Sequence, residues 1–172
     1  MKTDLRHYIR NIEDFPKPGV TFRDITPLLL DPRATDAALD QLCDQAKGLG
    51  ITKVAAIESR GFFFGSLIAY RLGVGYIPVR KKGKLPFSTL SVTYDLEYGT
   101  DTLEIHTDAI VPGDRVLIHD DVLATGGTAR AAVELVEKAG GQVVLLSFLM
   151  ELKALGGGEK LSGHPVKCLM EF

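Results

Sequence analysis

The sequence predicts a single α/β domain built on a mostly parallel sheet, and two observations support this prediction. Four short segments are apolar throughout rather than alternating with polar residues, and helical or loop segments separate them. Strands that are apolar on both faces are typical of parallel sheets that helices cover on both sides. The length of 172 residues also suits one domain, so we expect a single domain over residues 1–172.

The expected strands are Lys53–Ile57, Gly75–Val79, Arg115–His119 and Gln142–Met150. One expected helix, over residues 34–50, has apolar residues at spacings of three and four and ends at two glycines. Two more helices, over residues 62–73 and 128–140, follow the first and third strands. This alternation of strand and helix favours right-handed connections within one sheet.

Two segments interrupt the alternation. The prolines and glycine of Phe15–Pro32 predict an irregular arm. Residues 80–102 begin basic, continue polar and aromatic, and show no sustained period. A loop of this length in a compact domain is usually functional or disordered. Two compatible interpretations remain open, namely a lid over a site and an exposed β-hairpin with residues 91–98 and 101–106 as its arms.

Composition excludes several classes of protein. The net charge of −2 provides no broad basic surface for nucleic acid. The N-terminal segment lacks the apolar core of a signal peptide, and the apolar runs are too short to cross a membrane. The two cysteines form no close motif and the four histidines lack metal-ligand spacing. We expect a cytoplasmic protein that binds neither nucleic acid nor membranes and holds no zinc.

The stretch VLIHDDVLATGGTA, Val116–Ala129, indicates a binding site at the end of the third strand. Ligands of open α/β sheets lie beyond the carboxyl ends of the strands. The amides at the start of a helix lack intrahelical partners, and two glycines let the backbone approach a phosphate. Asp120 and Asp121 would repel that phosphate, but they suit ribose hydroxyls or Mg²⁺. The combination suggests a ribose 5-phosphate site, and the alternative is a tight turn capped by threonine.

Two further loops carry anion-binding residues, and each has an ordinary alternative. Residues 58–61, ESRG, follow the first strand and include Arg60 as a charged clamp, although the segment could be a simple capping turn. Residues 80–84, RKKGK, follow the second strand and could be a solvated basic patch. Taken with the third strand, the three loops indicate diphosphate at the first two and a monophosphate at the third.

Glu97 lies within the segment 80–102. A carboxylate that a closing lid buries could have a raised pKa and exchange a proton with a bound base; the alternative is a surface glutamate in a hairpin. His119, just before the aspartates, is expected to pack on the sheet rather than act as a catalyst.

Two other nucleotide-binding motifs do not fit. The pattern G-x-x-x-x-G-K-[ST] of a P-loop is absent from the sequence. The segment GVGYIP has Gly73 and Gly75 of a dinucleotide-binding motif, but Pro78 stands where its third glycine belongs.

The stretch Val116–Ala129 resembles the 5-phosphoribosyl-1-diphosphate (PRPP) binding motif of type I phosphoribosyltransferases. The segments FPKPGVTFRDITPLL, ESRGFFFG, PVRKKGKLP and YDLEYGTDTLEIH are similar, in the same order, to further signatures of the adenine-specific members. The resemblance covers nearly the whole chain. It implies the type I phosphoribosyltransferase fold, with a central mostly parallel sheet flanked by helices. It also implies a small hood to which residues 1–32 contribute and a flexible lid at about residues 81–102.

The same resemblance implies an activity. Adenine and PRPP would give AMP and diphosphate in purine salvage, catalysed by a homodimer with Mg²⁺. The metal would be held mainly by PRPP, near Asp120 and Asp121, with no assured direct protein ligand. The catalytic residues would be Glu97, Arg60 and Tyr98, with Glu97 handling the proton.

The resemblance also implies a contact for each remaining site residue. Asp120 and Asp121 would bind the ribose hydroxyls. The 5-phosphate would be bound by Ala124, Thr125, Gly126, Gly127 and Thr128. The diphosphate would be bound by Glu58, Ser59, Arg60, Gly61, Arg80, Lys81 and Lys84, with a cis peptide bond between Glu58 and Ser59. Adenine would contact Thr21, Phe22, the backbone of Arg23, and Leu152.

The chain departs from the family pattern at two positions. His119 stands where an aliphatic residue is usual, and the sequence offers no physical account of it. Thr21 stands where a hydrophobic residue is common, and we expect this to weaken packing on the base by roughly 1 kcal/mol.

Two alternative functions remain open. The enzyme could use hypoxanthine, guanine or xanthine, although such a pocket usually needs a donor for the 6-oxo group. The chain could also be a non-catalytic regulator that senses PRPP. Such a regulator typically carries a DNA-binding segment and a basic face, whereas this chain has a net negative charge.

Overall fold

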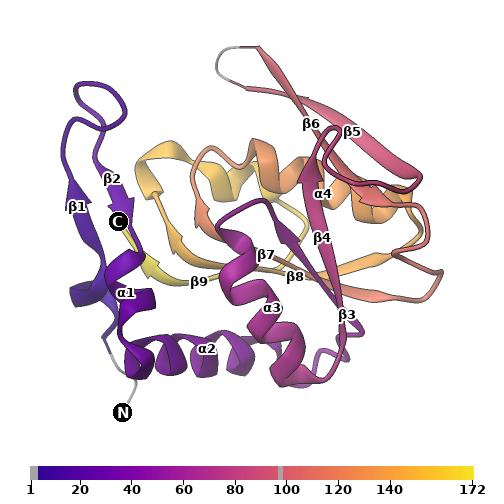
Figure 1. The fold of residues 1–172 in the computed structure, drawn as a ribbon, viewed down its shortest axis with the longest axis horizontal. Helices are drawn as coiled ribbons and strands as arrows, with labels where there is room; N and C mark the ends of the chain where they lie inside the picture. The colour runs from indigo at the N-terminus through magenta and orange to yellow at the C-terminus, as the bar shows by residue number, and fades with distance from the viewer. Residues whose placement is uncertain (1–3, 97–98) are drawn as a thin grey trace. The chain divides into compact units, whose positions relative to one another are not determined.

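The computed structural model describes residues 4–96 and 99–172 (Figure 1). The chain divides into two compact units, Met1–Gln41 and Leu42–Phe172. Helix α2, Pro32–Ala46, spans the boundary between them. Each unit is described by itself.

The first unit contains a short two-stranded sheet. Strands β1, Arg10–Ile12, and β2, Phe22–Asp24, pair antiparallel. The unit also holds the 3₁₀ helix η1, Arg6–Tyr8, and the helix α1, Thr26–Leu30. The Asp24 carboxylate accepts hydrogen bonds from the backbone N–H and the hydroxyl of Thr26, at 2.9 and 2.8 Å, where α1 begins.

The prediction of an irregular arm over residues 15–32 was therefore wrong for the part that forms β2 and α1. Pro16, Pro18 and Gly19, whose φ is +83°, lie in the loop between β1 and β2, whereas Pro27 lies in the first turn of α1 and Pro32 begins α2. The local signal of the loop residues did not extend to the segment after the loop, where backbone pairing with β1 and the Asp24 contact to Thr26 form regular structure.

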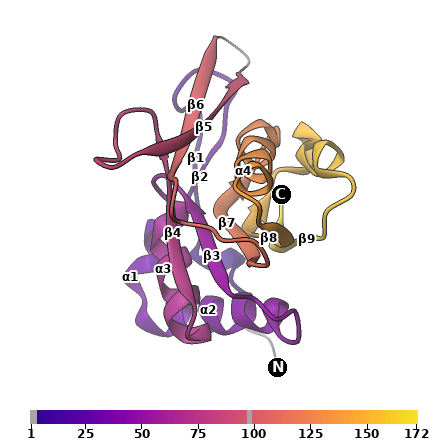
Figure 2. The same ribbon diagram turned by 90° about the vertical axis from the view of Figure 1, so that its right-hand side faces the viewer.

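The second unit is built on a seven-stranded sheet of order β5-β6-β4-β3-β7-β8-β9. Its strands are β3 Lys53–Ile57, β4 Gly75–Lys81, β5 Thr89–Asp95, β6 Thr100–His106, β7 Arg115–Leu123, β8 Gln142–Glu151 and β9 Val166–Glu171. The strands from β4 to β9 in this order run parallel, while β6 and β5 add an antiparallel hairpin at one edge. The hairpin projects beyond the rest of the sheet (Figure 2).

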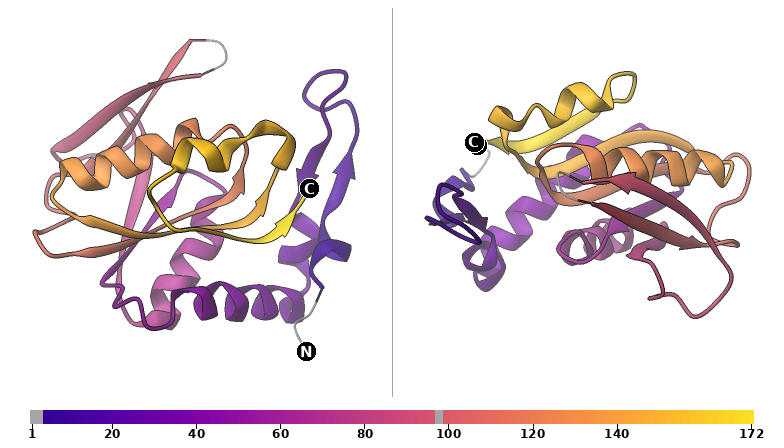
Figure 3. Two further views of the ribbon diagram at one scale, coloured as in Figure 1. Left: turned by 180° about the vertical axis from the view of Figure 1, so that it is seen from behind. Right: turned by 90° about the horizontal axis from the view of Figure 1, so that it is seen from above.

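Helices cover both faces of this sheet. Helix α3, Gly61–Leu72, lies in front of the sheet in Figure 1, and α4, Gly127–Lys138, lies in front when the unit is seen from behind in Figure 3. Alternate residues of β3 point to opposite faces of the sheet. Ala55 belongs to the core cluster that includes residues of α4, while Ala56 faces α3. A Cβ added at Gly65 would lie 2.3 Å from the Cβ of Ala56, so glycine lets α3 approach β3 closely. Two short 3₁₀ helices, η2 Lys153–Leu155 and η3 Gly157–Leu161, follow β8.

The predicted α/β fold with a mostly parallel sheet is confirmed, and the four predicted strands correspond to β3, β4, β7 and β8. Three predicted ends were too early, because β7 continues beyond His119 to Leu123, β4 beyond Val79 to Lys81, and β8 beyond Met150 to Glu151. Asp120, Val122 and Leu123 keep their register with β8, so both aspartates lie inside the strand. The predicted hairpin is also present, formed by β5 and β6. Strand β9 was missed, because this edge strand has no apolar run and is only partly buried.

Candidate active site

The turn between β7 and α4 is held by close backbone contacts. Gly126 occupies the N-cap position of α4 with a left-handed φ of +79°. A Cβ on Gly126 would lie 2.5 Å from the carbonyl oxygen of Gly157, and one on Gly157 would lie 2.2 Å from that of Ala124. Only glycine fits at these two positions, and the absence of side chains lets the backbone of η3 pack directly against the turn. This use of Gly157 was not predicted from the sequence.

The turn borders a small cavity. Its volume is about 80 Å³, and its lining residues are Asp120, Val122, Leu123, Ala124, Thr125, Gly126, Thr128, Ala129 and Phe148. Helix α4 starts at Gly127, so the first amides of the helix have no intrahelical partner. A small anion with hydrogen-bond acceptors would suit a cavity bordered by such amides and by threonine hydroxyls.

The two aspartates face different surroundings. Successive residues of a strand point to opposite faces, and Asp120 lines the cavity while Asp121 forms an ion pair with Arg60. The Arg60 Nε atom lies 3.0 Å from Asp121 Oδ2, and the Asp121 side chain is only 4% exposed. Arg60 immediately precedes α3 as its N-cap residue.

Burial shifts the pKa of both carboxyls. Burial and the negative charge of Asp121 raise the pKa of Asp120 well above its usual range. Burial also raises the pKa of Asp121, although the Arg60 guanidinium opposes that shift. A cation or a set of hydroxyl donors beside Asp120 would therefore stabilise its charged form.

The loop before α3 packs closely on β7. A Cβ on Gly61 would lie 2.9 Å from the carbonyl oxygen of His119 and 3.0 Å from Asp120 Oδ1. Glycine at this position lets residues 58–61 lie against the strand that carries the aspartates. The peptide bond between Glu58 and Ser59 is cis, as the resemblance implied.

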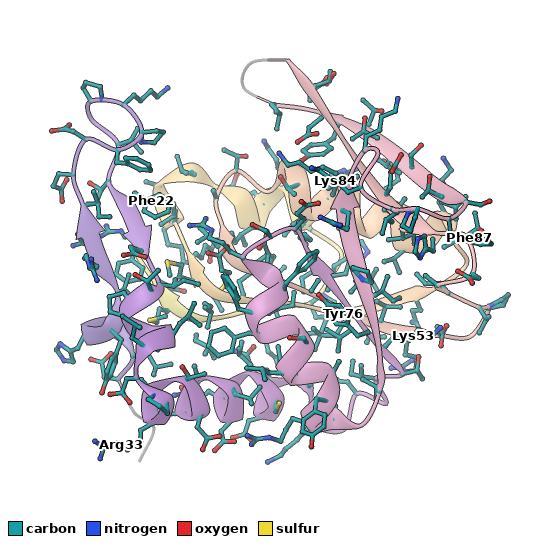
Figure 4. The ribbon with its side chains drawn as sticks, in the orientation of Figure 1. Phe22, Arg33, Lys53, Tyr76, Lys84 and Phe87 are labelled. Atoms are coloured by element: carbon teal, nitrogen blue, oxygen red, sulfur yellow. The ribbon has the colours of Figure 1, made fainter. Side chains whose placement is uncertain are left out.

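Glu58 connects this loop to the end of β4. Its carboxylate accepts two hydrogen bonds from the Arg80 guanidinium, both at 3.2 Å, and one from the backbone N–H of Lys81 at 3.0 Å. Burial works against the charge, but the hydrogen bonds from Arg80 and Lys81 hold the pKa of Glu58 below its ordinary value. Arg80 also donates to the carbonyl of Lys84, at 3.2 Å, in the connection between β4 and β5. Lys84 is labelled in Figure 4. Glu58 therefore orients Arg80.

Lys81 forms an ion pair with the hairpin. Its Nζ atom lies 3.0 Å from Asp101 Oδ2 on β6. This contact raises the pKa of Lys81 and lowers the pKa of Asp101. The lysine side chain remains 57% exposed, so bulk water and salt weaken the attraction between the two groups.

Leu152 lies beside the start of the turn between β7 and α4. Its backbone N–H donates to the carbonyl of Leu123 at 2.9 Å. The next residue, Lys153, pairs with Glu151 at 2.8 Å and with Glu171 on β9 at 3.0 Å. These contacts hold the backbone of Leu152 in a defined position.

In the first unit, Thr21, Phe22 and Arg23 lie at the start of β2 or within it. The Thr21 hydroxyl donates to the Glu13 carboxylate at 2.6 Å. Phe22, labelled in Figure 4, packs edge-to-face on Phe15 with ring centroids 5.4 Å apart. The guanidinium of Arg23 donates to the side-chain oxygen of Asn11. The unusual Thr21 therefore has a polar partner across the hairpin, which the sequence did not predict.

The second unit brings together the predicted anion-binding segments 58–61, 80–84 and 120–128, which follow or end β3, β4 and β7. Glu97 and Tyr98 lie outside the described residues. Within residues 4–96 and 99–172 there is no group of three or more potential metal-binding side chains. Over the same residues, no helix is long and apolar enough to cross a membrane.

His119 is fully buried in the middle of the sheet, between Ala56 of β3 and Ser147 of β8 in the strand register. Neither ring nitrogen has a hydrogen-bond partner among the described residues. Burial lowers the pKa of His119 to about 3. The ring is therefore neutral at physiological pH and packs as part of the sheet, in agreement with the expectation from the sequence.

Comparisons with known proteins agree with this arrangement. A family model described as phosphoribosyl transferase domain matches residues 29–169. The adenine phosphoribosyltransferase of Carboxydothermus hydrogenoformans is 56% identical over 169 residues, which cover 98% of this chain and 99% of the relative.

Two solved structures are similar over nearly their whole length. The adenine phosphoribosyltransferase of Thermoanaerobacter pseudethanolicus is 52% identical, with a TM-score of 0.95 and 98% of both chains covered. The enzyme from Saccharomyces cerevisiae, complexed with an imino-altritol bisphosphate and adenine, is 40% identical, with a TM-score of 0.91 and 96% of both chains covered.

We predict that His119→Leu makes stability less sensitive to acid. The folded-state pKa of about 3 lies below the unfolded value near 6.5, so the unfolded chain binds one more proton at this residue between these values. Stability is therefore lost as the pH falls below about 6.5, by up to roughly 1.4 kcal/mol per pH unit. Urea unfolding at pH 7, 6 and 5 would measure the free energy of unfolding of both proteins. We expect this free energy to fall less steeply with decreasing pH in the variant, by up to this amount per pH unit. Equal slopes in the two proteins would contradict the prediction.

Proposed function

The chain belongs to the adenine phosphoribosyltransferase family, and on that premise we propose that it converts adenine and PRPP into AMP and diphosphate. The observation that carries this proposal is the placement of the anion-binding segments. Residues 58–61, 80–84 and 120–128 are associated with β3, β4 and β7, which are neighbours in the sheet. Segments at the carboxyl ends of neighbouring parallel strands can contact one ligand that carries charge at both ends.

The proposed chemistry is a displacement at the anomeric carbon of the ribose. The bond from this carbon to diphosphate breaks, a bond to a ring nitrogen of adenine forms, and adenine loses the proton of that nitrogen. Positive charge develops on the ribose ring, and the carboxylates of Asp120 and Asp121 would stabilise it. Arg60, Arg80 and Lys81 would stabilise the leaving diphosphate. Glu97, on the segment expected to form the lid, would handle the proton.

The residues present fit Mg²⁺ bound mainly through the substrate. Asp120 lines the cavity beside the turn, and its raised pKa means that a neighbouring cation would favour its charged form. Since the described residues offer no cluster of three metal-binding side chains, PRPP and water would supply most of the metal's oxygen ligands. When bound, Mg²⁺ would neutralise charge on the diphosphate.

We assign the 5-phosphate to residues 124–128 and the diphosphate to residues 58–61 together with Arg80, Lys81 and Lys84. Adenine contacts are assigned to Thr21, Phe22, the backbone of Arg23, and Leu152. The proposal includes one functional domain over residues 1–172, with a hood that residues 1–32 help to form and a lid at about 81–102. Relatives that match over nearly their full length support this assignment.

We place the reaction in purine salvage, because it returns free adenine to the nucleotide pool, and in the cytoplasm. The sequence has two cysteines that form no close motif, a composition that fits a reducing compartment.

The choice of base can be tested directly. The purified protein would be incubated with PRPP, Mg²⁺ and one base at a time, and the nucleotide products would be quantified by chromatography. We expect AMP to form faster than IMP, GMP or XMP. Faster formation of one of the other nucleotides would overturn the assignment to adenine. Absence of every nucleotide, with PRPP bound intact, would favour the non-catalytic regulator.

We predict that Glu97→Gln lowers kcat for AMP formation by about 100-fold or more, because the amide cannot exchange the proton of the base. Steady-state kinetics would measure kcat and the KM for PRPP separately. Glu134→Gln, which changes an exposed glutamate on α4, serves as the matched control and should keep the wild-type rate. A kcat of Glu97→Gln within about twofold of wild type would remove this residue from the mechanism.

We also propose a homodimer that forms through the exposed face of α3. Phe63, Leu67 and Tyr70 are 49%, 37% and 87% exposed. Their spacing of four and then three residues places them on one side of the helix. Exposed apolar side chains that cluster in this way mark interaction surfaces.

The double variant Phe63→Glu with Tyr70→Glu should therefore be monomeric, because four carboxylates would face each other across the proposed interface. Light scattering coupled to size-exclusion chromatography would measure the mass of wild type and variant at the same concentration. Glu134→Lys, on the other helix, controls for the change of charge and should remain dimeric. A monomeric wild-type protein, or a variant that stays dimeric, would contradict the proposed interface.

A further inference from the structure

The β5–β6 hairpin lies along α4 and contacts it near both ends of the helix. The Lys138 ammonium donates to the carbonyl of Ser91 at 3.1 Å. At the other end, the Thr128 hydroxyl donates to the Tyr94 hydroxyl at 3.3 Å. The Tyr94 ring also lies beside Gly127, 3.9 Å from the point that a Cβ would occupy. Tyr94 thus rests on the turn that we assign to the 5-phosphate.

The residue opposite Tyr94 in the hairpin contacts the other anion-binding segment. Tyr94 and Asp101 are directly paired across β5 and β6, and side chains paired in this way share one face. Asp101 forms the 3.0 Å ion pair with Lys81, which follows the Glu58–Arg80 contact at the end of β4. A single cross-strand pair therefore touches a residue assigned to the 5-phosphate and another assigned to the diphosphate.

We propose that the Tyr94–Asp101 pair engages one residue of each phosphate-binding segment, Thr128 and Lys81, so that PRPP must displace the pair in order to bind. The inference rests on the proposed function, because it requires Thr128 and Lys81 to bind the two charged ends of PRPP. Tyr94 and Asp101 are positioning residues in this inference. They act on the substrate through Thr128 and Lys81, and they hold the hairpin in place.

The chemistry of each contact sets up a competition. The Thr128 hydroxyl has one proton and cannot donate it to Tyr94 and to a phosphate at the same time. The Asp101 carboxylate, held at Lys81, repels an incoming diphosphate. Ribose 5-phosphate alone competes only with Tyr94 for Thr128, and diphosphate alone competes only with Asp101 for Lys81. PRPP competes with both contacts, so it releases the hairpin more completely than either fragment.

The test uses Tyr94→Phe and Asp101→Asn, which remove one contact each and keep the side-chain shape. Calorimetric titration in Mg²⁺ buffer would measure the Kd of ribose 5-phosphate and of diphosphate for each protein. We expect Tyr94→Phe to bind ribose 5-phosphate about threefold more tightly with diphosphate unchanged. Asp101→Asn should bind diphosphate about threefold more tightly with ribose 5-phosphate unchanged. The double variant should lower the KM for PRPP by about tenfold.

Thr93→Val provides the matched control. Thr93 pairs with Thr102 in the neighbouring position of the hairpin, where the two hydroxyls lie 2.9 Å apart, and it contacts neither phosphate-binding segment in the described structure. Replacing Thr93 by valine should leave the Kd values of ribose 5-phosphate and diphosphate unchanged.

Salt dependence provides a second check. Because the Lys81–Asp101 contact is an exposed ion pair, the Asp101→Asn effect should shrink between about 50 and about 500 mM salt, while the Tyr94→Phe effect should persist.

The outcomes separate this inference from the proposed function. If wild type forms no AMP from adenine and PRPP, the proposed function fails. If wild type forms AMP but both variants bind the two fragments as wild type does, only the inference fails. Weaker binding in either variant would also overturn it, since Tyr94 or Asp101 would then assist the bound substrate instead of competing with it.

Discussion

The site depends on how closely the neighbouring backbones approach β7. A Cβ at Gly61 would lie about 3 Å from His119 and Asp120, so glycine lets the start of α3 pack directly on β7, and Gly157 in the same way lets η3 pack against Ala124. Each approach is closer than any side chain would allow. Without them, the loop 58–61 and the turn 124–128 would lie farther from the strand that carries the aspartates. Arg60, which precedes α3, would then also lie farther from Asp121, with which it pairs at 3.0 Å.

Charge pairing is the second organising feature of this site. Arg60 pairs with Asp121, Arg80 with Glu58, and Lys81 with Asp101. These three cations, all assigned to an anionic substrate, are thus each paired with a carboxylate in this structure. Pairing avoids leaving partly buried like charges uncompensated next to one another. It also means that substrate binding exchanges one set of ion pairs for another, so affinity reflects a difference between two electrostatic arrangements.

Much of the fold could be predicted from the sequence, because uniformly apolar segments such as Val54–Ile57 specify buried parallel strands directly. Strand β9 and the pair β1–β2 could not, because backbone pairing with a neighbour, rather than their own hydrophobicity, holds them in the sheet. The phosphate turn was predictable because glycines after a strand have a local meaning.

The residues that support the site from distant parts of the sequence were not predictable, because no local pattern connects them to the residues they contact. Gly157 lies about thirty positions from the turn that it supports, and Asp101 lies twenty from Lys81. Such partners become visible only when the chain is folded. The packing of His119 on the sheet, in contrast, was expected from the sequence, and its complete burial between β3 and β8 agrees with that expectation.

The contact between η3 and the turn has a consequence for how this region tolerates change. It joins main-chain atoms of Gly157 to those of Ala124 and Gly126. The outward side chains of η3, such as Glu159 and Lys160, take no part in it and are exposed. These two positions can therefore vary in side-chain identity, whereas Gly157 and the buried Leu161 are restricted. An insertion or deletion between the end of β8 and η3 would shift the main chain away from the turn, so the length of this connection is restricted as well.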